Sequence, residues 1–570
     1  MAMLWSIVVL ILTLFLSPSS SAFYNPASVP NNKYGIHVAD PNDIPATAAL
    51  VNSQGGDWGY VTVVVQETDR DPGKWQKIFN EMRRLHLVPL VRLATHVEGN
   101  AWAKPKLDSL PEWVNFLGQL NWPTENRYVI LFNEPNHAKE WGNTLDPEGY
   151  AEILVKFATT FKQKSEDFFV LPAGLDASAD GNGETMDAAV FLKRIVASQP
   201  DFLNLIDGWI SHSYPNPGFS GSPRARGRGT LRTYQWELAY LSELGNQKRL
   251  PVFITETGWM HSQGKIFNPL LLAPEAVAGN LTLAAATVWP DPRVVAVTPF
   301  VFNYQDLPFD HFSWKTLGGD NYYPPYFAYQ AIPKVKGRPR QRLEFKLSSA
   351  LFPATLVASS SYTLTTKIKN LGQGILDPVD DYRLTVEAKP NFNWVVERLP
   401  TLEPGEEGEI TIHLTTAAPP GTYNFRVQLE HGETSLILED AQVVLVPPPT
   451  IAVKAQLGWR KSNTASDVTV LVYDGDRLLL KFTGLTLTDG QIEVSGISDI
   501  IPGERYRVVV LVPYYLPRQT ILPLASGRTV VAFKRFLPLD FNLDGRLDVA
   551  DLLALIKLKP NFVLQLFLGP

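Results

Sequence analysis

Two kinds of hydrophobic patterning divide the chain near residue 335. Before that point, short apolar runs alternate with stretches in which apolar residues recur every three or four positions, as in amphipathic helices. After it, apolar and polar residues alternate one by one, which is typical of strands with a single buried face. The chain therefore predicts repeated β–α units followed by β-rich domains.

Eight β-rich runs fall between residues 33 and 333, and both their number and the length of this region are those of a (β/α)8 barrel. A doubly wound open sheet shares the alternation, but no glycine-rich phosphate loop follows the first run. We therefore predict an α/β fold with a TIM barrel over residues 23–335. The runs are YGIHV, DWGYVTVVV, LVPLVRLAT, RYVILFNEP, FFVLPAGLD, LIDGWISHSY, RLPVFITETGW and VVAVTPFVFNY.

A basic segment with proline and glycine, residues 334–342, separates the barrel from the β-rich part. In YNFRVQLEH, apolar side chains alternate with polar ones, and turn signals such as PPGTY stand between such runs. This pattern predicts an immunoglobulin-like β-sandwich over residues 340–446. After three consecutive prolines, runs such as ERYRVVVLVP predict a second small β-sandwich over residues 450–536.

The beginning of the chain is apolar. A run from Leu4 to Leu16 is followed by small residues, with Ser20 and Ala22 at the positions that precede a signal-peptidase site. The run is short for a membrane span. We therefore predict a signal peptide over residues 1–22 and a secreted or cell-surface protein.

Composition narrows the classes of function. The chain has no cysteine, which excludes disulfides, a thiol nucleophile and cysteine-ligated metals. Its formal net charge of -6 gives no excess of positive charge of the kind that binds nucleic acid. Aromatic residues reach 11%, and the 14 Trp among them indicate either a large core or flat surfaces on which a ligand stacks.

Polar side chains follow several of the apolar runs in the barrel region. Residues directly after a strand emerge at the C-terminal mouth of a barrel, where barrel enzymes place their chemistry. Any one of these clusters could be a helix cap or a solvated loop, but together they leave two carboxylates facing one pocket. The clusters are Asn133 and Glu134 in FNEPN, His212 and Tyr214 in SHSYP, and Glu256 and Trp259 in TETGW.

These motifs resemble those of the retaining clan A glycoside hydrolases, over roughly residues 30–335. The resemblance implies that Glu134 is the general acid/base and that Glu256 is the nucleophile. It also implies that Asn133 bonds the sugar 2-hydroxyl and that Tyr214 donates a hydrogen bond to the nucleophile.

Further residues of the same pocket follow from the resemblance and from position. His212 is expected to line the wall beside Tyr214, and Arg92, after the third run, is an expected electrostatic partner. Trp259 and Tyr304 lie next to the catalytic strand ends, so we expect them to stack against sugar rings.

The implied activity is hydrolysis of O-glycosidic bonds in a polysaccharide or oligosaccharide by double displacement, with no cofactor. Two alternatives stay open. One is a carbohydrate-binding or adhesion protein with an inert barrel, and the other is a transglycosylase that uses the same residues. The presence of both glutamates favours an enzyme.

The acidic segment DFNLDGRLDVAD, within residues 538–570, has the spacing of an EF-hand calcium loop. It resembles a dockerin repeat, since one helix follows the loop and aspartate occupies the last position. The resemblance implies Ca2+ binding and a cohesin-type scaffold as partner, although a single repeat also allows a purely structural role. The predicted ligands are Asp540, Asn542, Asp544, Arg546 through its carbonyl, Asp548 and Asp551.

Overall fold

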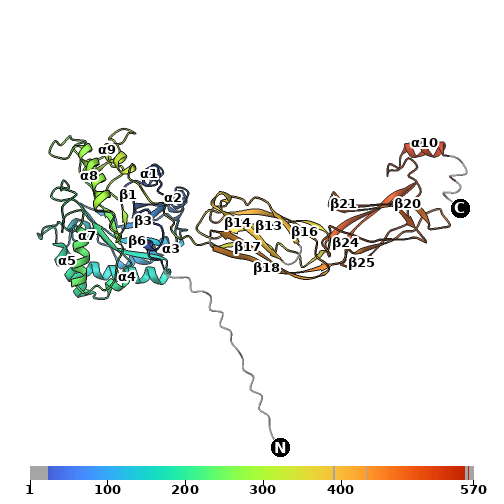
Figure 1. Ribbon diagram of the computed structural model, residues 1–570, viewed down its shortest axis with the longest axis horizontal. Helices are drawn as coiled ribbons and strands as arrows, with labels where there is room; N and C mark the ends of the chain where they lie inside the picture. The colour runs from blue at the N-terminus through green and yellow to red at the C-terminus, as the bar shows by residue number, and fades with distance from the viewer. Residues whose placement is uncertain (1–22, 389–391, 433, 559–562, 564–570) are drawn as a thin grey trace, which may run out of the picture. The chain divides into compact units, whose positions relative to one another are not determined.

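The computed structural model describes residues 23–388, 392–432, 434–558 and 563. The predicted signal peptide therefore lies outside the described residues. Within these residues, no helix has both the length and the apolar character needed to cross a membrane. The chain divides into two compact units between Arg342 and Leu343 (Figure 1).

The strands of the first unit are parallel and close into a ring. One sheet has the order β1-β2-β3-β6-β7, and a second has the order β10-β9-β8. Single parallel bridges, Tyr34 to Val297 and Asp176 to His212, join the sheets at both edges. The described strands thus form a closed barrel. They are β1 (Gly35–Val38), β2 (Gly59–Gln66), β3 (Leu87–Ala94), β6 (Arg127–Leu131), β7 (Phe168–Pro172), β8 (Trp209–His212), β9 (Val252–Glu256) and β10 (Val294–Val297).

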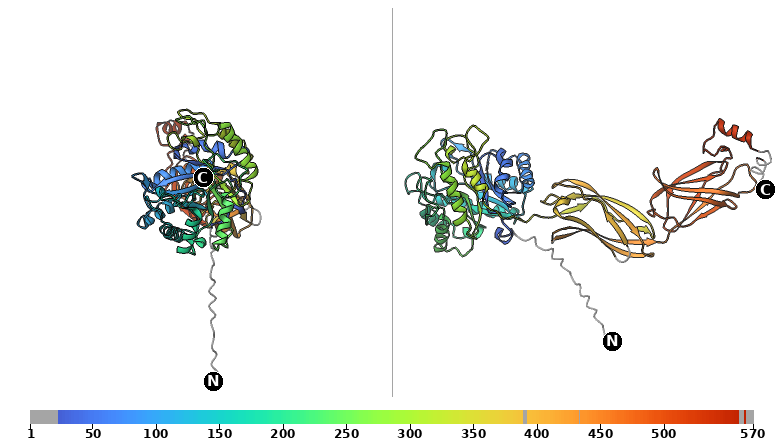
Figure 2. Two further views of the ribbon diagram at one scale, coloured as in Figure 1. Left: turned by 90° about the vertical axis from the view of Figure 1, so that its left-hand side faces the viewer. Right: turned by 45° about the horizontal axis from the view of Figure 1, so that its top comes forward.

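Helices surround the strands of this unit (Figure 2). Each buries one stripe against the barrel, as α2 does with Trp75, Phe79 and Met82 at spacings of four and three residues. A short hairpin, β4 (Val97–Glu98) and β5 (Ala101–Trp102), follows β3. The helices are α1 (Ile44–Val51), α2 (Pro72–Arg84), α3 (Leu110–Gln119), α4 (Pro147–Lys164), α5 (Ala188–Ser198), α6 (Phe202–Leu205), α7 (Thr233–Glu243), α8 (Pro274–Thr287) and α9 (Pro324–Gln330).

Aromatic side chains fill the interior of the barrel. Tyr128 packs against Phe169 with ring centroids 5.0 Å apart, and Phe169 packs against Phe253 at 5.6 Å. All three rings are buried. Because they come early in their strands, they form a solid floor beneath the residues at the C-terminal strand ends.

The second unit contains two hydrophobic cores, each enclosed by two β-sheets (Figure 2). Strict alternation explains the first core, since every second residue of β13 is buried. The sheets around it contain β11 (Phe345–Leu347), β13 (Ser361–Asn370), β16 (Glu407–Thr416) and β15 (Phe392–Val396), and β12 (Thr355–Val357), β18 (Thr434–Val446), β17 (Gly421–His431) and β14 (Tyr382–Ala388).

The sheets around the second core contain β22 (Gln491–Val494), β19 (Thr450–Lys454) and β25 (Arg528–Ala532), and β21 (Arg477–Leu487), β20 (Ala465–Asp474), β23 (Arg505–Val512) and β24 (Tyr515–Pro523). The acidic segment follows, and then α10 (Val549–Lys557). This arrangement agrees with the β-rich domains that the alternation predicts.

One carboxyl group, that of Glu237, lies deep in the barrel unit. Glu237 on α7 is 1% exposed, and its Oε2 has no hydrogen-bond partner. Burial raises the pKa of Glu237 from 4.5 to about 7. The folded protein therefore resists an ionisation that the unfolded chain undergoes freely, and stability is lost as the pH rises from about 4.5 to about 7.

We predict that Glu237→Gln stabilises the protein at pH 8, by up to about 3 kcal/mol, because glutamine removes the cost of the buried acid. At pH 4 the carboxyl is protonated in both states, so the substitution should change stability little. Thermal unfolding measured by calorimetry at both pH values checks this. A difference between variant and wild type that is independent of pH would contradict it.

Candidate active site

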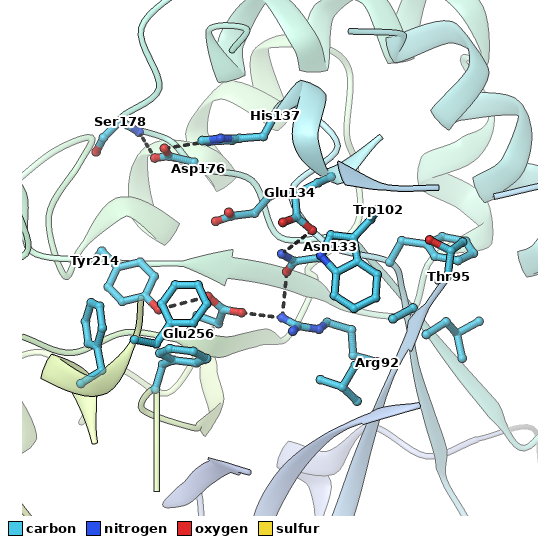
Figure 3. Close-up of a pocket in the computed structure, with 18 of the residues that line it drawn as sticks. Arg92, Thr95, Trp102, Asn133, Glu134, His137, Asp176, Ser178, Tyr214 and Glu256 are labelled. Carbon is cyan, nitrogen blue, oxygen red and sulfur yellow. Dashed lines mark hydrogen bonds and ion pairs between the residues drawn. The ribbon is translucent and has the colours of Figure 1, made fainter. Parts of the chain in front are cut away.

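A cavity of about 470 Å³ opens at the C-terminal ends of the barrel strands (Figure 3). One part of its wall is polar and another part is aromatic. The polar residues include Arg92, Asn133, Glu134, His137, Glu140, Asp176, Tyr214 and Glu256. The aromatic residues include Trp102, Phe219, Phe300, Phe309 and Phe312. Such a mixture of apolar surface and a few polar groups is typical of a small-molecule or glycan site.

Glu134 and Glu256 face each other across this cavity. Glu256 is the last residue of β9, and Glu134 follows the end of β6 by three positions. One carboxylate oxygen of each, together with Nδ1 of His212, lies within 4.8 Å of the others. The two barrel strands thus bring two carboxyl groups, distant in sequence, to the two sides of one site.

Strong donors surround Glu256. Arg92 donates to its Oε1 at 2.5 Å, and the hydroxyl of Tyr214 donates to its Oε2 at 3.0 Å. Burial alone would raise the pKa of Glu256, but the charges of His212 and Arg92 lower it to about 2. Burial and the Glu256 charge raise the pKa of Tyr214 well above its ordinary value. Near neutral pH, Glu256 is therefore an anion and Tyr214 a fixed donor.

Glu134 is held by its backbone and by His212. Its backbone N–H donates to the carbonyl of Gly174 at 3.1 Å, and its Oε1 lies 2.8 Å from Nδ1 of His212. The backbone of Phe132 has a φ of 72°, which residues other than glycine seldom adopt. This turn directs Glu134 into the cavity, and such local strain is frequent at functional sites.

His212 is buried next to both carboxyl groups, with its Nδ1 2.8 Å from Glu134 and 3.8 Å from Glu256. It is 4% exposed and does not line the cavity, so the expectation that it lines the wall is wrong. Burial works against protonation, but the carboxylates of Glu256 and Glu134 raise the pKa of His212. A buried imidazole between two acids can hold both of them in place.

The amide of Asn133 connects two charged groups. Its Oδ1 accepts a hydrogen bond from Arg92 at 2.8 Å, and its Nδ2 donates to Oε2 of Glu140 at 3.2 Å. Asn133 lines the cavity, as does Arg92. Figure 3 shows the dashed chain that runs from Glu256 through Arg92 to Asn133.

Trp259 and Tyr304, the two residues expected to stack against sugar rings, do not line the cavity. The ring of Trp259 packs in the hydrophobic core of the barrel unit, where it is 2% exposed. Its Nε1 donates to the carbonyl of Gly221. Tyr304 packs edge-on against Phe309 with centroids 5.4 Å apart. The burial of Trp259 makes its prediction as a stacking residue wrong, whereas that of Tyr304, which is half-buried, stays a prediction. Trp102 and Phe309 present aromatic surface in the cavity.

Three ionisable residues of the cavity are absent from the sequence-based prediction. His137 and Glu140 follow the Asn-Glu-Pro motif, in and beside a short 3-10 turn, where sequence gives no sign of their direction. Nε2 of His137 lies 3.0 Å from Oδ2 of Asp176. Asp176 ends the fifth apolar run, so the strand-end argument applied to that run would have included it.

The acidic loop before α10 is held by bonds to its own backbone. Oδ1 of Asp551 accepts from the N–H of Phe541 at 2.8 Å, and its Oδ2 accepts from the N–H of Asp548 at the same distance. Oδ1 of Asp544 accepts from the N–H of Arg546 at 2.8 Å. Across the described residues, the one group of three His, Asp or Glu side chains with ligand atoms within 4.8 Å of one another is Glu134, His212 and Glu256.

No protein-family model matches the sequence, and no curated protein matches it. Solved structures with a similar chain path include a family 39 glycoside hydrolase from Bacteroides cellulosilyticus WH2, at 13% identity and a TM-score of 0.37, covering 69% of this chain and 82% of that one.

Two others complete the comparison. A family 128 endo-beta-1,3-glucanase from Amycolatopsis mediterranei, solved with laminaritriose, has 14% identity and a TM-score of 0.32 over 52% of this chain and 98% of its own. A fungal beta-1,4-galactanase has 9% identity and a TM-score of 0.38 over 53% of this chain and 100% of its own. Similarities of this size do not assign a function, so the function is inferred from the geometry of the site.

Proposed function

We propose that the protein is a secreted retaining glycoside hydrolase that cleaves O-glycosidic bonds in a polysaccharide. The observation that carries the proposal is the pair of carboxyl groups, Glu134 and Glu256, with oxygens within 4.8 Å across one cavity. Retaining enzymes hold their two carboxyls about 5–5.5 Å apart, whereas inverting enzymes leave about 6.5–9.5 Å for a water molecule. The observed separation supports retention.

In the first step, Glu256 attacks the anomeric carbon while Glu134 gives its proton to the leaving oxygen. The glycosidic C–O bond breaks as an ester forms between the sugar and Glu256. Arg92 and Tyr214 keep Glu256 anionic and fix its orientation before the attack. The developing positive charge on the sugar is stabilised by the same anion.

In the second step, a water molecule enters where the leaving group departed. Glu134, now deprotonated, removes a proton from this water, and the oxygen attacks the anomeric carbon. The ester bond breaks and Glu256 is released as a carboxylate. The hydrogen bond to His212 keeps Glu134 on the same side of the cavity through both steps.

An inert carbohydrate-binding barrel is the less supported alternative. Ligand binding alone gives no reason to hold a buried anion between Arg92 and Tyr214, directly opposite a second carboxyl group. A transglycosylase would use the same two steps with a sugar in place of the water, and the products distinguish it.

Incubation with a panel of plant, fungal and microbial polysaccharides tests the proposal. We expect at least one polymer to release new reducing ends, and the double variant Glu134→Gln/Glu256→Gln to release none. Glu152→Gln, which changes an exposed glutamate on α4, is the matched control and should behave like wild type. Equal release by the double variant would refute the assignment.

We also propose that the acidic loop binds Ca2+ and that the module is structural, with a cohesin-type scaffold as the alternative. Oδ1 of Asp540 is buried without a hydrogen-bond partner, as expected of an oxygen suited to a cation. The φ of 81° at Gly545 provides the sharp turn that such a loop requires at its sixth position.

Calcium binding is predicted to require Asp540 and Asp544 and to leave the barrel chemistry unchanged. Calorimetric titration of the whole protein with Ca2+ should show a site that Asp540→Asn and Asp544→Ala each weaken at least tenfold, because the first removes a negative charge from a ligand and the second removes a ligand of a doubly charged ion. If the wild type takes up no calcium, or both variants bind it equally well, the loop is only a turn with matching spacing.

A further inference from the structure

The charges on the cavity wall are unevenly distributed. Four carboxyl groups line it, and among the residues that the structure describes Arg92 is the only lysine or arginine on the wall. The carboxyls belong to Glu134, Glu140, Asp176 and Glu256. The proposed reaction uses two of them, so Glu140 and Asp176 need another explanation.

The positive charge of Arg92 is already balanced. Its Nη1 lies 2.5 Å from Oε1 of Glu256 and also donates to Asn133 at 2.8 Å. His137, the remaining basic group on the wall, is paired with Asp176 at 3.0 Å. Recognition of a sugar carboxylate ordinarily needs a guanidinium or ammonium group that has no other anion to neutralise.

Glu140 extends the negative charge from the catalytic pair along the wall. Its carboxyl accepts a hydrogen bond from the amide of Asn133, which in turn contacts Arg92 beside Glu256. A neutral sugar can donate hydroxyl hydrogens to such a carboxylate. A sugar carboxylate in the same place would face the charge of Glu140, while Arg92 is already paired with Glu256 and leaves no cation to offset that charge.

We propose that this cavity selects uncharged glycans and rejects glycans that carry carboxylates, and that Glu140 is the residue that sets this preference. The inference rests on the proposed function, since it concerns the substrate of the same site. Asp176 contributes less to the rejection because His137 neutralises it.

The test uses two derivatives of whichever polymer the protein cleaves, prepared with equal degrees of substitution. Carboxymethyl groups add negative charge, and hydroxyethyl groups add similar bulk without charge. The assay runs near pH 8, because burial and the charge of Glu134 raise the pKa of Glu140 to about 7. We expect kcat/KM to be about 100-fold lower for the carboxymethyl polymer, as two like charges a few ångströms apart in a partly buried site imply.

Glu140→Gln tests the named residue. We expect the substitution to lower the ratio of kcat/KM for the hydroxyethyl polymer to kcat/KM for the carboxymethyl polymer at least about tenfold. The reason is that it removes one charge at nearly constant volume. The ratio is unaffected by a general loss of rate, which a merely structural role would cause. Glu152→Gln is the control and should leave the ratio unchanged.

The outcomes separate the two proposals. If the underivatised polymer is cleaved and both derivatives are digested equally, the charge preference is refuted and the glycosidase assignment stands. An unchanged ratio in Glu140→Gln refutes the role of that residue. If no polymer is cleaved, the proposed function itself fails, and this inference fails with it.

Discussion

Glu256→Gln is expected to lower kcat by more than about 10⁴-fold, beyond the usual contribution of a general acid. Glutamine matches the volume of glutamate but cannot form the glycosyl ester. The substitution also removes the anion that Arg92 and Tyr214 contact at 2.5 Å and 3.0 Å. Steady-state kinetics on the polymer identified by the panel measure the effect.

Thermal unfolding of the variant shows whether this loss of activity comes from a loss of fold. Glu256 lies at the end of β9, above the aromatic floor of the barrel, so thermal unfolding of the variant should still show a cooperative transition. A folded Glu256→Gln protein that keeps a tenth or more of wild-type activity would show that another group attacks the anomeric carbon.

Glu134→Gln is expected to reduce kcat by about 10²–10⁴-fold on a polysaccharide, because the leaving sugar oxygen then departs without a proton. An aryl glycoside whose leaving group is already acidic needs little protonation, so its first step should be affected much less. The two substrates, compared in the same variant, separate general-acid catalysis from a general loss of structure.

Azide gives a second readout for the same residue. In Glu134→Ala, the cavity left by the side chain can admit azide, which needs no general base to attack the glycosyl ester. Added azide should therefore restore turnover of the aryl glycoside. An equal loss on both substrates, with no azide effect, would remove Glu134 from the acid/base role.

Much of the barrel could be predicted from the chain, because its signals are local and repeated. Each of the eight apolar runs contains a parallel strand, and the amphipathic stretches between them form helices. The strand-end argument placed Glu134 and Glu256 on one cavity because all parallel strands of a barrel end at the same mouth.

The direction in which an individual side chain points cannot be predicted from these local patterns, because it depends on tertiary packing. Trp259 follows a catalytic strand end, yet packing favours burying its large ring in the core. Glu140 lies in a 3-10 turn whose orientation depends on tertiary contacts. The acidic loop matches a calcium spacing in sequence, and in the structure its carboxylates accept hydrogen bonds from backbone N–H groups of the same loop, so calcium binding stays a prediction.

The anomeric configuration of the first-formed product tests the central claim most directly. The account has Glu256 attack the sugar and water attack the resulting ester, so two inversions occur at one carbon. Proton NMR followed from the start of the reaction, before mutarotation, should show a product with the anomeric configuration of the substrate. A first product with the opposite configuration would contradict the account, because Glu256 would then activate water instead of forming a bond to the sugar.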